Sequence, residues 1–229
     1  MTPADSAWKV LIVDDHPVVR EGLKLCLSLY PEFVVTGEAS AIIEAMELIQ
    51  VERPDVVVVD ISLRASSGID LIGMIRGLHA GIHVLCWSMH VDALYAERAF
   101  RAGADGYITK LEATECVIDA IRELLDGRIY LNQSIAEELL RSNSSGGRYS
   151  WPVDAVSLLS DRELETYRLL GEGKSVKEIA LQLAKNFRTI ETFIARIKKK
   201  LLLEDREKLL KSAFEWVQRQ HQPASGRDP

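Results

Sequence analysis

The sequence has few cysteines, few aromatic residues and no long hydrophobic run. Cys26, Cys86 and Cys116 are the 3 cysteines among 229 residues, and they lack the paired spacing of a zinc site. We interpret them as reduced, mostly buried, small apolar residues. No stretch of about 18 apolar residues is present, and the polar start of the chain does not resemble a signal peptide. We therefore expect a cytoplasmic protein with no membrane partner.

The net charge of −6 hides an asymmetry between the two halves of the chain. Residues 1–131 contain 11 Lys and Arg against 20 Asp and Glu, whereas residues 132–229 contain 17 against 14. Residues 185–200 alone hold six basic residues and one acidic residue. An acidic half joined to a half with a basic segment predicts two domains with different partners.

Short runs of β-branched residues alternate with helical patterns over the first half. Such runs fit strands that are buried on both faces, and the alternation predicts right-handed βαβ units and a parallel sheet. We expect strands at residues 10–14, 33–36, 56–60, 82–86 and 106–109, and helices at residues 18–29, 41–51, 69–78, 93–102 and 113–125.

Four of these strands end at, or are followed by, polar side chains that can act together in phosphoryl chemistry. Asp14 and Asp15 end the first strand, Asp60 the third and Lys110 the fifth, and Ser88 follows the fourth. Ligands of parallel sheets bind beyond the carboxyl ends of the strands, so we expect these side chains to converge. Three carboxylates in one pocket repel each other and recruit a hard cation, for which Mg²⁺ is the natural choice. A single aspartate at a strand end is usually a turn former, so the prediction depends on the whole set.

This set of residues suits phosphoryl transfer. With a metal ion present, Asp60 can act as a carboxylate nucleophile on a phosphoryl group. Mg²⁺ and Lys110 would neutralise the transferred oxygens, and the Ser88 hydroxyl could donate to the acyl phosphate. The alternative is an enzyme, either a flavodoxin-like flavoprotein or a stand-alone phosphatase. The absence of a glycine-rich loop after the first strand opposes nucleotide binding.

The same residues resemble the functional set of response-regulator receiver domains. The similarity covers about residues 8–128 and includes the segments DISLRASSG at 60–68 and AGADGYITK at 102–110. It implies an α/β flavodoxin-like fold of five strands and five helices. The family usually has Met-Pro where this chain has Leu63-Arg64, and often proline or a small residue where it has Leu111.

The resemblance also implies roles for individual residues. Asp60 would be the phosphoacceptor, and Asp15 would bind the metal directly. Asp14 would act on the metal largely through water, and the carbonyl oxygen of Ser62 would be a further ligand. Tyr107 resembles the aromatic switch residue, which turns inward when the hydroxyl residue, here Ser88, moves.

The second half of the chain begins with a change of pattern. Residues 132–157 combine a short helical pattern at 135–140 with a Ser-, Asn- and Gly-rich stretch at 142–147, which predicts a flexible linker. Capping boxes at residues 160–163 and 175–178 then predict two helices, separated by Gly171 and Gly173.

A third helix of this half follows a short turn at residues 184–186. It places Ile190, Ile194, Ile197 and Leu201 on its inner face and basic residues on the other side. A short helix, a tight turn and a basic second helix suit docking in the major groove of DNA. From periodicity alone, a small helical bundle with a basic solvated face is an equal alternative.

Three segments of this half resemble the LuxR-type helix-turn-helix. They are LSDRE at 159–163, GKSVKEIA at 173–180 and TIETFIARIKKKL at 189–201, and the similarity covers about residues 156–218. Attached to a receiver, this all-α domain makes the chain similar to the NarL/FixJ family of transcription regulators. Phe193 stands where the family commonly has His, and we expect an apolar contact there. Leu202 stands where Gly is common, and we expect it to extend the helix.

The resemblance implies a DNA interface on the third helix. Glu191 could accept from a cytosine amino group, and Thr192 or Ala195 could touch a thymine methyl. Phosphate contacts are expected from Lys177, Arg188, Arg196 and Lys199, and Thr189 belongs to the same interface.

The last helix, residues 206–218, would be a dimerisation helix by resemblance; the alternative is ordinary packing on the core of its own domain. Its apolar residues are Leu209, Leu210, Ala213 and Val217. Residues 221–229 are expected to form a disordered tail.

The sequence thus predicts a receiver at residues 1–131, a linker at 132–157 and a helix-turn-helix domain at 158–220. We expect a two-component transcription regulator that a sensor histidine kinase phosphorylates on Asp60. The only reactions expected of the chain itself are self-phosphorylation and self-dephosphorylation. It would bind double-stranded promoter DNA as a homodimer, at inverted or direct half-sites, after phosphorylation releases a masked or monomeric state. The alternatives are a C-terminal domain that binds another protein and a regulator that ignores phosphorylation.

Overall fold

The computed structural model describes residues 7–63, 66–90, 93–133, 135–137 and 155–221. The chain divides into two compact units between residues 145 and 146. The expected linker stretch at 142–147 and residues 222–229 of the expected tail lie outside the described residues. The expectation is wrong for His221, which is the last residue of a helix. Within the described ranges, no helix is both long enough and apolar enough to cross a membrane.

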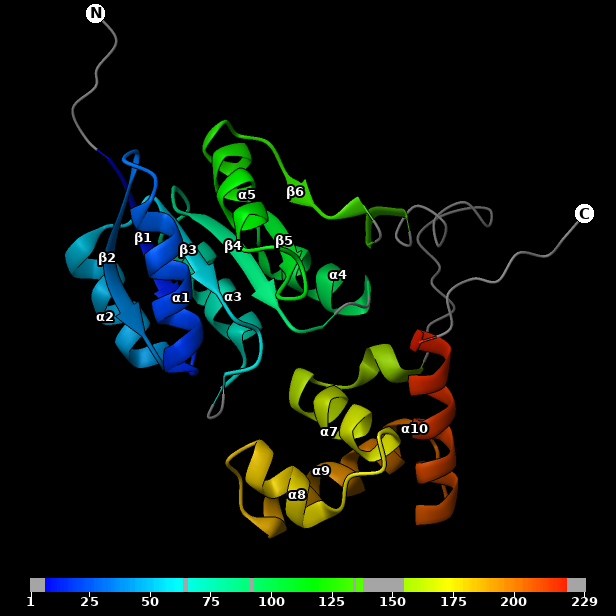
Figure 1. Ribbon diagram of the computed structural model, residues 1–229. Helices are drawn as coiled ribbons and strands as arrows, with labels where there is room; N and C mark the ends of the chain where they lie inside the picture. Colours follow the sequence, from blue (N-terminus) through cyan, green and yellow to red (C-terminus); the bar gives the residue numbers. More distant parts are fainter. Residues whose placement is uncertain (1–6, 64–65, 91–92, 134, 138–154, 222–229) are drawn as a thin grey trace, which may run out of the picture. The chain divides into compact units, whose positions relative to one another are not determined.

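The first unit is built on a parallel sheet of six strands in the order β2-β1-β3-β4-β5-β6 (Figure 1). All five neighbouring pairs are parallel. This confirms the α/β fold class and its parallel sheet. The strands are β1 Trp8–Val13, β2 Phe33–Ala39, β3 Val56–Val59, β4 His83–Ser88, β5 Gly106–Thr109 and β6 Tyr130–Leu131.

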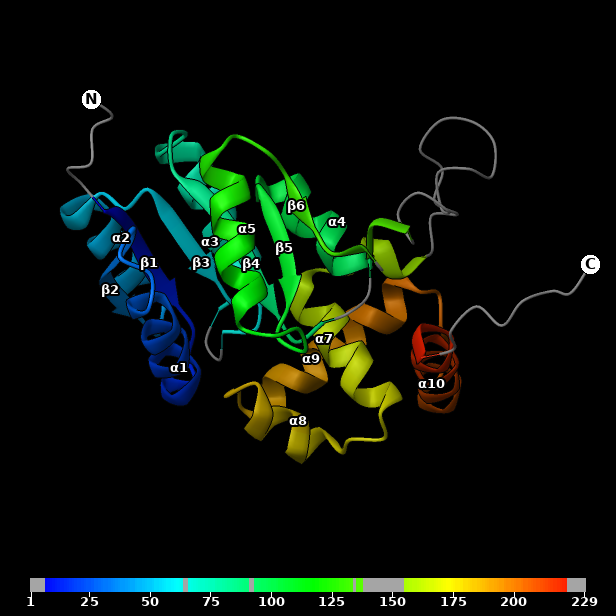
Figure 2. The same cartoon turned by 45° about the horizontal axis from the view of Figure 1, so that its top comes forward.

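Helices cover both faces of this sheet, with α1 and α5 on one face and α2, α3 and α4 on the other (Figures 1 and 2). The cover explains why β3 is an unbroken run of four buried valines. The strand order reverses between β1 and β3, and ligands of such sheets bind beyond the carboxyl ends of the two strands at this point. The helices are α1 Pro17–Ser28, α2 Ile42–Glu52, α3 Gly68–Leu78, α4 Ala93–Ala102 and α5 Glu115–Leu125.

The sixth strand was not expected from the sequence. β6 has only two residues, which are too few to show a strand pattern. Directly after it, the Asn132 side-chain amide donates to Glu112 Oε1 at 2.8 Å. The same oxygen accepts from the backbone N–H and the hydroxyl of Thr109, each at 3.0 Å. The chain therefore leaves the sheet hydrogen-bonded to the loop that carries Lys110.

The second unit is helical, as expected. Its described residues form a 3-10 turn, η1 Ala155–Leu158, and helices α7 Asp161–Gly171, α8 Val176–Gln182, α9 Phe187–Lys200 and α10 Arg206–His221. Both expected capping boxes are present, at Ser160 and at Ser175. The turn from Leu183 to Asn186 joins α8 to α9, and Asn186 caps α9 by accepting from the N–H of Thr189. The helix-turn-helix is therefore formed by α8 and α9.

Three helices of this unit end in the same way. Two positions beyond the last residues of α7, α8 and α9, the backbone is left-handed, at Gly173 (φ 80°), Ala184 (φ 47°) and Leu202 (φ 55°). The expectation that Leu202 extends α9 is wrong. The N–H groups of Leu202 and Leu203 bond back to carbonyls in the last turn of α9, which ends the helix at Lys200.

Helix α7 packs against both α9 and α10. A Cβ atom at Gly171 would lie 2.4 Å from the carbonyl oxygen of Ala213, so only glycine allows α10 to approach this closely. Lys200 Nζ lies 2.6 Å from Glu163 Oε2 and 3.0 Å from the carbonyl oxygen of Leu158. The last residue of α9 is thereby bonded to the buried first turn of α7.

Candidate phosphorylation site and nucleic-acid interface

The carboxyl ends of β1 and β3 bring three aspartates together. Asp14, Asp15 and Asp60 are 2%, 9% and 3% exposed. Together with His16 they form a group in which one ligand atom of each residue lies within 4.8 Å of the others. The backbone sets this register, because the N–H of Asp60 donates to the carbonyl of Val13 at 2.8 Å.

Lys110 extends from the end of β5 into this cluster. Its Nζ lies 2.8 Å from Asp60 Oδ2 and also bonds to Asp14 Oδ2. The same Nζ lies 5.5 Å from the centre of the Trp87 ring on β4, within the range of a cation–π contact. The backbone N–H of Lys110 donates to the carbonyl of Ser88 at 2.7 Å. The structure therefore brings together the expected acidic and basic strand ends.

The charges in this pocket do not balance. Burial raises the pKa of the Asp60 carboxyl and the nearby Asp14 adds to the effect, although Lys110 opposes it. Burial also disfavours the charged form of Lys110, but Asp60 and Asp14 outweigh it and raise the pKa of the ammonium. Three buried carboxylates face one ammonium, and oxygen ligands of this kind are those that Mg²⁺ prefers. The residues present thus fit a magnesium ion.

The loop after β3 folds back onto Asp60. The N–H of Ser62 donates to Asp60 Oδ1 at 3.0 Å, and the N–H of Gly68 donates to the carbonyl of Ile61 at 2.8 Å. A Cβ atom at Gly68 would lie 2.0 Å from the carbonyl oxygen of Asp60. Glycine at this position therefore lets α3 begin against the backbone of the expected phosphoacceptor.

The two expected switch residues bond to the backbone of one buried residue, His90. Ser88 and Tyr107 are both fully buried. Ser88 Oγ accepts from the N–H of His90 at 3.1 Å, and the Tyr107 hydroxyl donates to the carbonyl of His90 at 2.8 Å. The hydroxyl of Tyr107 is therefore held inside the unit, next to the end of β4.

Three residues of this pocket were not singled out from the sequence. They are His16, Trp87 and His90. His16 Nδ1 lies 3.0 Å from Asp15 Oδ1. His16 and His90 come one and two residues after strand-end residues that were singled out, so the same reasoning could have found both.

Most residues expected at a DNA interface lie on the exposed side of α9. Ile190, Ile194 and Ile197 face the core, as expected for the inner face of this helix. Leu201, expected on the same face, is half-buried and lies just beyond the end of α9. Arg188, Thr192, Ala195, Arg196 and Lys199 are exposed, and so is Lys177 on α8. One basic residue behaves differently, because Lys200 turns toward Glu163 and the core.

Thr189 and Glu191 lie at the flanks of that exposed side. The Thr189 hydroxyl donates to the capping Asn186 side chain at 2.9 Å. The carboxylate of Glu191 lies 3.6 Å from the guanidinium of Arg206, the first residue of α10. Phe193 is half-buried. Helix α10 therefore places a cation beside the one acidic residue of α9.

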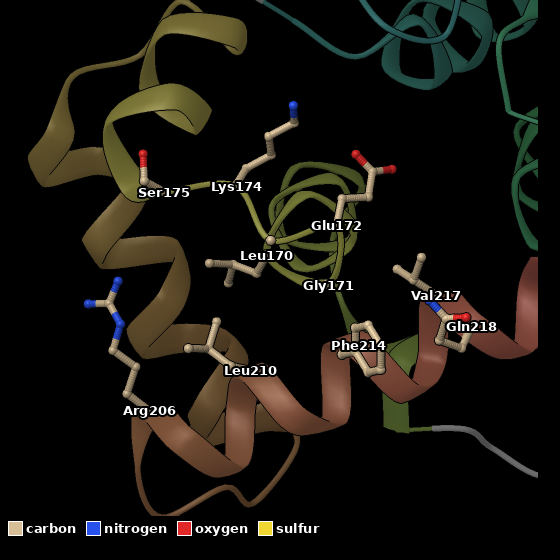
Figure 3. Close-up of a pocket in the computed structure, with 11 residues that line it drawn as sticks. Leu170, Gly171, Glu172, Lys174, Ser175, Arg206, Leu210, Phe214, Val217 and Gln218 are labelled. Carbon is tan, nitrogen blue, oxygen red and sulfur yellow. The ribbon is translucent and has the colours of Figure 1, made fainter.

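Three of the four residues expected at a dimer interface face their own domain. Leu209 and Ala213 are fully buried, and Val217 is 5% exposed. Leu210 is 38% exposed, and Phe214, one turn further on, is 53% exposed but was not singled out from the sequence. Both line a groove of about 820 Å³ between α7 and α10 (Figure 3).

Comparison with known proteins matches both units. The family model for the response regulator receiver domain matches residues 10–122, and that for bacterial regulatory proteins of the luxR family matches residues 157–213. The chain is 31% identical over 209 residues to the oxygen regulatory protein NreC of Staphylococcus carnosus. That alignment covers 90% of this chain and 96% of NreC.

Solved structures show the same likeness. A LuxR-family two-component response regulator from Aurantimonas sp. SI85-9A1 has 35% identity and a TM-score of 0.58, covering 60% of this chain and 99% of that one. RcsB from Salmonella enterica serovar Typhimurium, bound to promoter P1flhDC with the phosphomimetic BeF3−, has 25% identity and a TM-score of 0.59. That match covers 92% of this chain and 100% of RcsB.

A receiver unit with a buried acidic pocket, joined to a LuxR-type helix-turn-helix unit, defines a DNA-binding transcriptional response regulator and not a classical enzyme. The chain belongs to the NarL/FixJ family of two-component response regulators.

Proposed function

We propose that a sensor histidine kinase phosphorylates Asp60 and that the phosphorylated chain binds promoter DNA as a dimer. The observation that carries this proposal is the position of Lys110 Nζ, 2.8 Å from Asp60 Oδ2 within a buried cluster of aspartates. Phosphoryl transfer needs a nucleophilic carboxylate, a fixed ammonium and an excess of negative charge that can bind Mg²⁺.

The transfer begins when a carboxylate oxygen of Asp60 attacks the phosphorus of a phosphohistidine. A P–O bond forms as the P–N bond breaks, and the departing imidazole keeps the electron pair and takes up a proton. Lys110 stabilises the transferred oxygens while remaining protonated. Self-dephosphorylation is the attack of water on the same acyl phosphate, which restores the Asp60 carboxylate and releases inorganic phosphate.

Mg²⁺ would be held by Asp15, Asp60 and the carbonyl oxygen of Ser62, with Asp14 acting largely through water. When bound, the ion supplies positive charge to the phosphoryl oxygens. The aspartates suit this role because they are buried and already gathered at one edge of the sheet.

The proposed DNA interface is the exposed side of α9. Arg188, Arg196, Lys199 and, on α8, Lys177 would hold phosphates, which gives affinity without sequence choice. Glu191, Thr192 and Ala195 would read base edges. RcsB, which the chain matches over 92% of its length, is bound to promoter DNA in its solved structure, and this supports a DNA-binding role for the chain.

The proposed homodimer uses the exposed apolar residues of α10, namely Leu210 and Phe214. Both protrude at the groove beside α7, whereas Leu209, Ala213 and Val217 are covered by their own domain. A dimer would engage two half-sites, in inverted or direct order.

The phosphorylation site is tested by labelling the purified full chain with radioactive acetyl phosphate and Mg²⁺. The wild type should be labelled and Asp60→Asn should not. Asp119→Asn, a change of an exposed carboxylate on α5, serves as the matched control and should be labelled as the wild type is. Label persisting on Asp60→Asn would reject the assignment.

The consequence for DNA is tested by selecting binding sites from random duplexes in the presence of beryllofluoride. Glu191→Ala should change the selected sequence, whereas Lys199→Ala should weaken all sequences alike and lower the salt dependence by about one counterion. Equal, sequence-independent losses from both variants would reject this division of roles. Binding that ignores beryllofluoride would reject control by phosphorylation.

A further inference from the structure

His90 follows β4 and contacts residues of the loop after β3, of β5 and of α4, close to the proposed phosphorylation site. The residue is 7% exposed, and it lies two residues after Ser88, which ends β4. Its backbone N–H is bonded to Ser88 Oγ, and its carbonyl is bonded to the Tyr107 hydroxyl. The main chain of this residue is thereby fixed from two sides.

The ring of His90 makes two further contacts. Its Nε2 lies 2.9 Å from the hydroxyl oxygen of Ser62, in the loop that follows Asp60. Its face stacks on the ring of Tyr95 in α4, with the ring centres 3.9 Å apart and the planes within 6° of parallel. A ring held by its face on a buried tyrosine can turn little, so its edge is a fixed partner for Ser62.

Ser62 is the connection between this ring and the chemistry. Its N–H donates to Asp60 Oδ1 at 3.0 Å. The Ser62–His90 hydrogen bond joins residues that are 28 positions apart in the chain, so it closes a link that the backbone does not provide. Partners of this kind, which hold a ligand without touching the metal, commonly determine whether a site is preformed.

We propose that His90 is a positioning residue for the metal site. Its imidazole, held on Tyr95, fixes Ser62 so that the backbone of Ser62 is already placed for Mg²⁺ before the ion binds. The inference rests on the proposed function, because that function assigns the Ser62 carbonyl to the metal. It concerns the hydrogen bond and the ring stack, and it needs no change in the protonation of His90.

The test is the affinity of the unphosphorylated full chain for Mg²⁺, measured by calorimetric titration. His90→Phe keeps a ring against Tyr95 and loses the hydrogen bond, and Ser62→Ala removes the same bond from the other side. Each should weaken Mg²⁺ binding by about 5- to 10-fold, at or below the low end of the effects of such supporting residues. The double variant should bind no more weakly than either single variant, because both remove one interaction.

Two variants separate positioning from general damage. In His90→Gln the side-chain amide can reach about the position of Nε2, and affinity should return to within about 2-fold of the wild type. His83→Phe alters a half-buried histidine at the opposite end of the same strand and should leave Mg²⁺ binding unchanged. Thermal unfolding of each variant reports whether it folds; if His90→Phe does not, Ser62→Ala and His90→Gln carry the test.

The outcomes are distinct. Three results would each overturn the role of His90. The first is a wild-type affinity for Mg²⁺ in His90→Phe, and the second is a loss of affinity in the double variant that multiplies the two single losses. The third is an affinity of His90→Gln as weak as that of His90→Phe. A wild type that binds no Mg²⁺ would instead overturn the proposed metal site itself. The result expected is a measurable wild-type affinity, a shared loss and a recovery by glutamine.

Discussion

The two units place their functional residues in opposite environments. In the receiver, Asp14, Asp60 and Lys110 lie in a buried pocket, and each is fixed by the strand that precedes it. In the helix-turn-helix unit, Arg188 and Lys199 extend into solvent from a helix whose other side is the core. Changes in the pocket should therefore alter stability together with function, whereas changes on the exposed side of α9 should alter binding alone.

The largest effect is expected from Gly68→Ala, which tests whether the pocket is rigid. The new Cβ would lie 2.0 Å from the backbone of Asp60, so we expect the free energy of unfolding to fall by about 3 kcal/mol and phosphoryl labelling to be lost. Gly73→Ala in the same helix has nothing within 4 Å of its Cβ and should stabilise the unit by about 1 kcal/mol. Denaturant unfolding of both variants decides the matter, and equal effects would contradict it.

The second prediction uses the unbalanced charge of the pocket. Burial raises the pKa of Asp60 in the folded state above its ordinary value of 3.8. Ionisation of Asp60 therefore destabilises the folded state as the pH rises from 3.8 through this raised pKa. Without Mg²⁺, Asp60→Asn should therefore melt at a higher temperature than the wild type at pH 7, and the difference should vanish below pH 3.8.

Magnesium should reverse that order. At about 100 times its dissociation constant, a ligand stabilises the folded state by about 2.7 kcal/mol, and the wild type should gain more of this than Asp60→Asn does. Melting curves with and without Mg²⁺ measure both effects. A variant that is less stable than the wild type in the absence of metal would show that the pocket is not strained by its charge.

Neighbouring lysines on α9 sharpen the comparison within one helix. Lys200→Ala leaves the buried carboxylate of Glu163 without its cation, and we expect a loss of about 2 kcal/mol in the free energy of unfolding. Lys199→Ala should leave stability within about 0.5 kcal/mol of the wild type and weaken DNA binding. Unfolding curves and DNA titrations on both variants measure stability and DNA binding separately. Equal losses of stability in the two variants would contradict the comparison.

The smallest effect is expected at the end of α9. Leu202 is 89% exposed and has a left-handed backbone, which glycine adopts without strain. Leu202→Gly should therefore raise the free energy of unfolding by about 1 kcal/mol. Leu181→Gly, at an exposed position inside α8, should lower it by about the same amount. Loss of stability in both variants would contradict the strain at Leu202.

The receiver was the more predictable unit because its chemistry coincides with its strand ends. Strand β3 is an apolar run that stops at Asp60, and the same rule applies at Asp14 and Lys110. The two-residue β6 was not predictable, because its pairing depends on where α5 returns the chain. The strand-end rule points to the neighbourhood of His90 but not to its contacts, because its partners Ser62 and Tyr95 come together only in the fold.

Helix α10 shows a different reason for failure. It has one apolar face at Leu209, Ala213 and Val217 and a second at Leu210 and Phe214. Helical periodicity identifies both faces but does not say which one the domain covers. The close approach of α7 at Gly171 makes that choice, and it is visible only once the helices are packed.

That close approach has a geometric consequence for any paired form of the chain. Because α10 is held to α7 at Gly171 and α9 is held to α7 by Lys200 and Glu163, the angle between α9 and α10 is set inside a single subunit. Two subunits that meet through Leu210 and Phe214 would therefore hold their α9 helices at one fixed separation. The number of base pairs between half-sites would then be determined by a glycine and an ion pair that touch neither the DNA nor the other subunit.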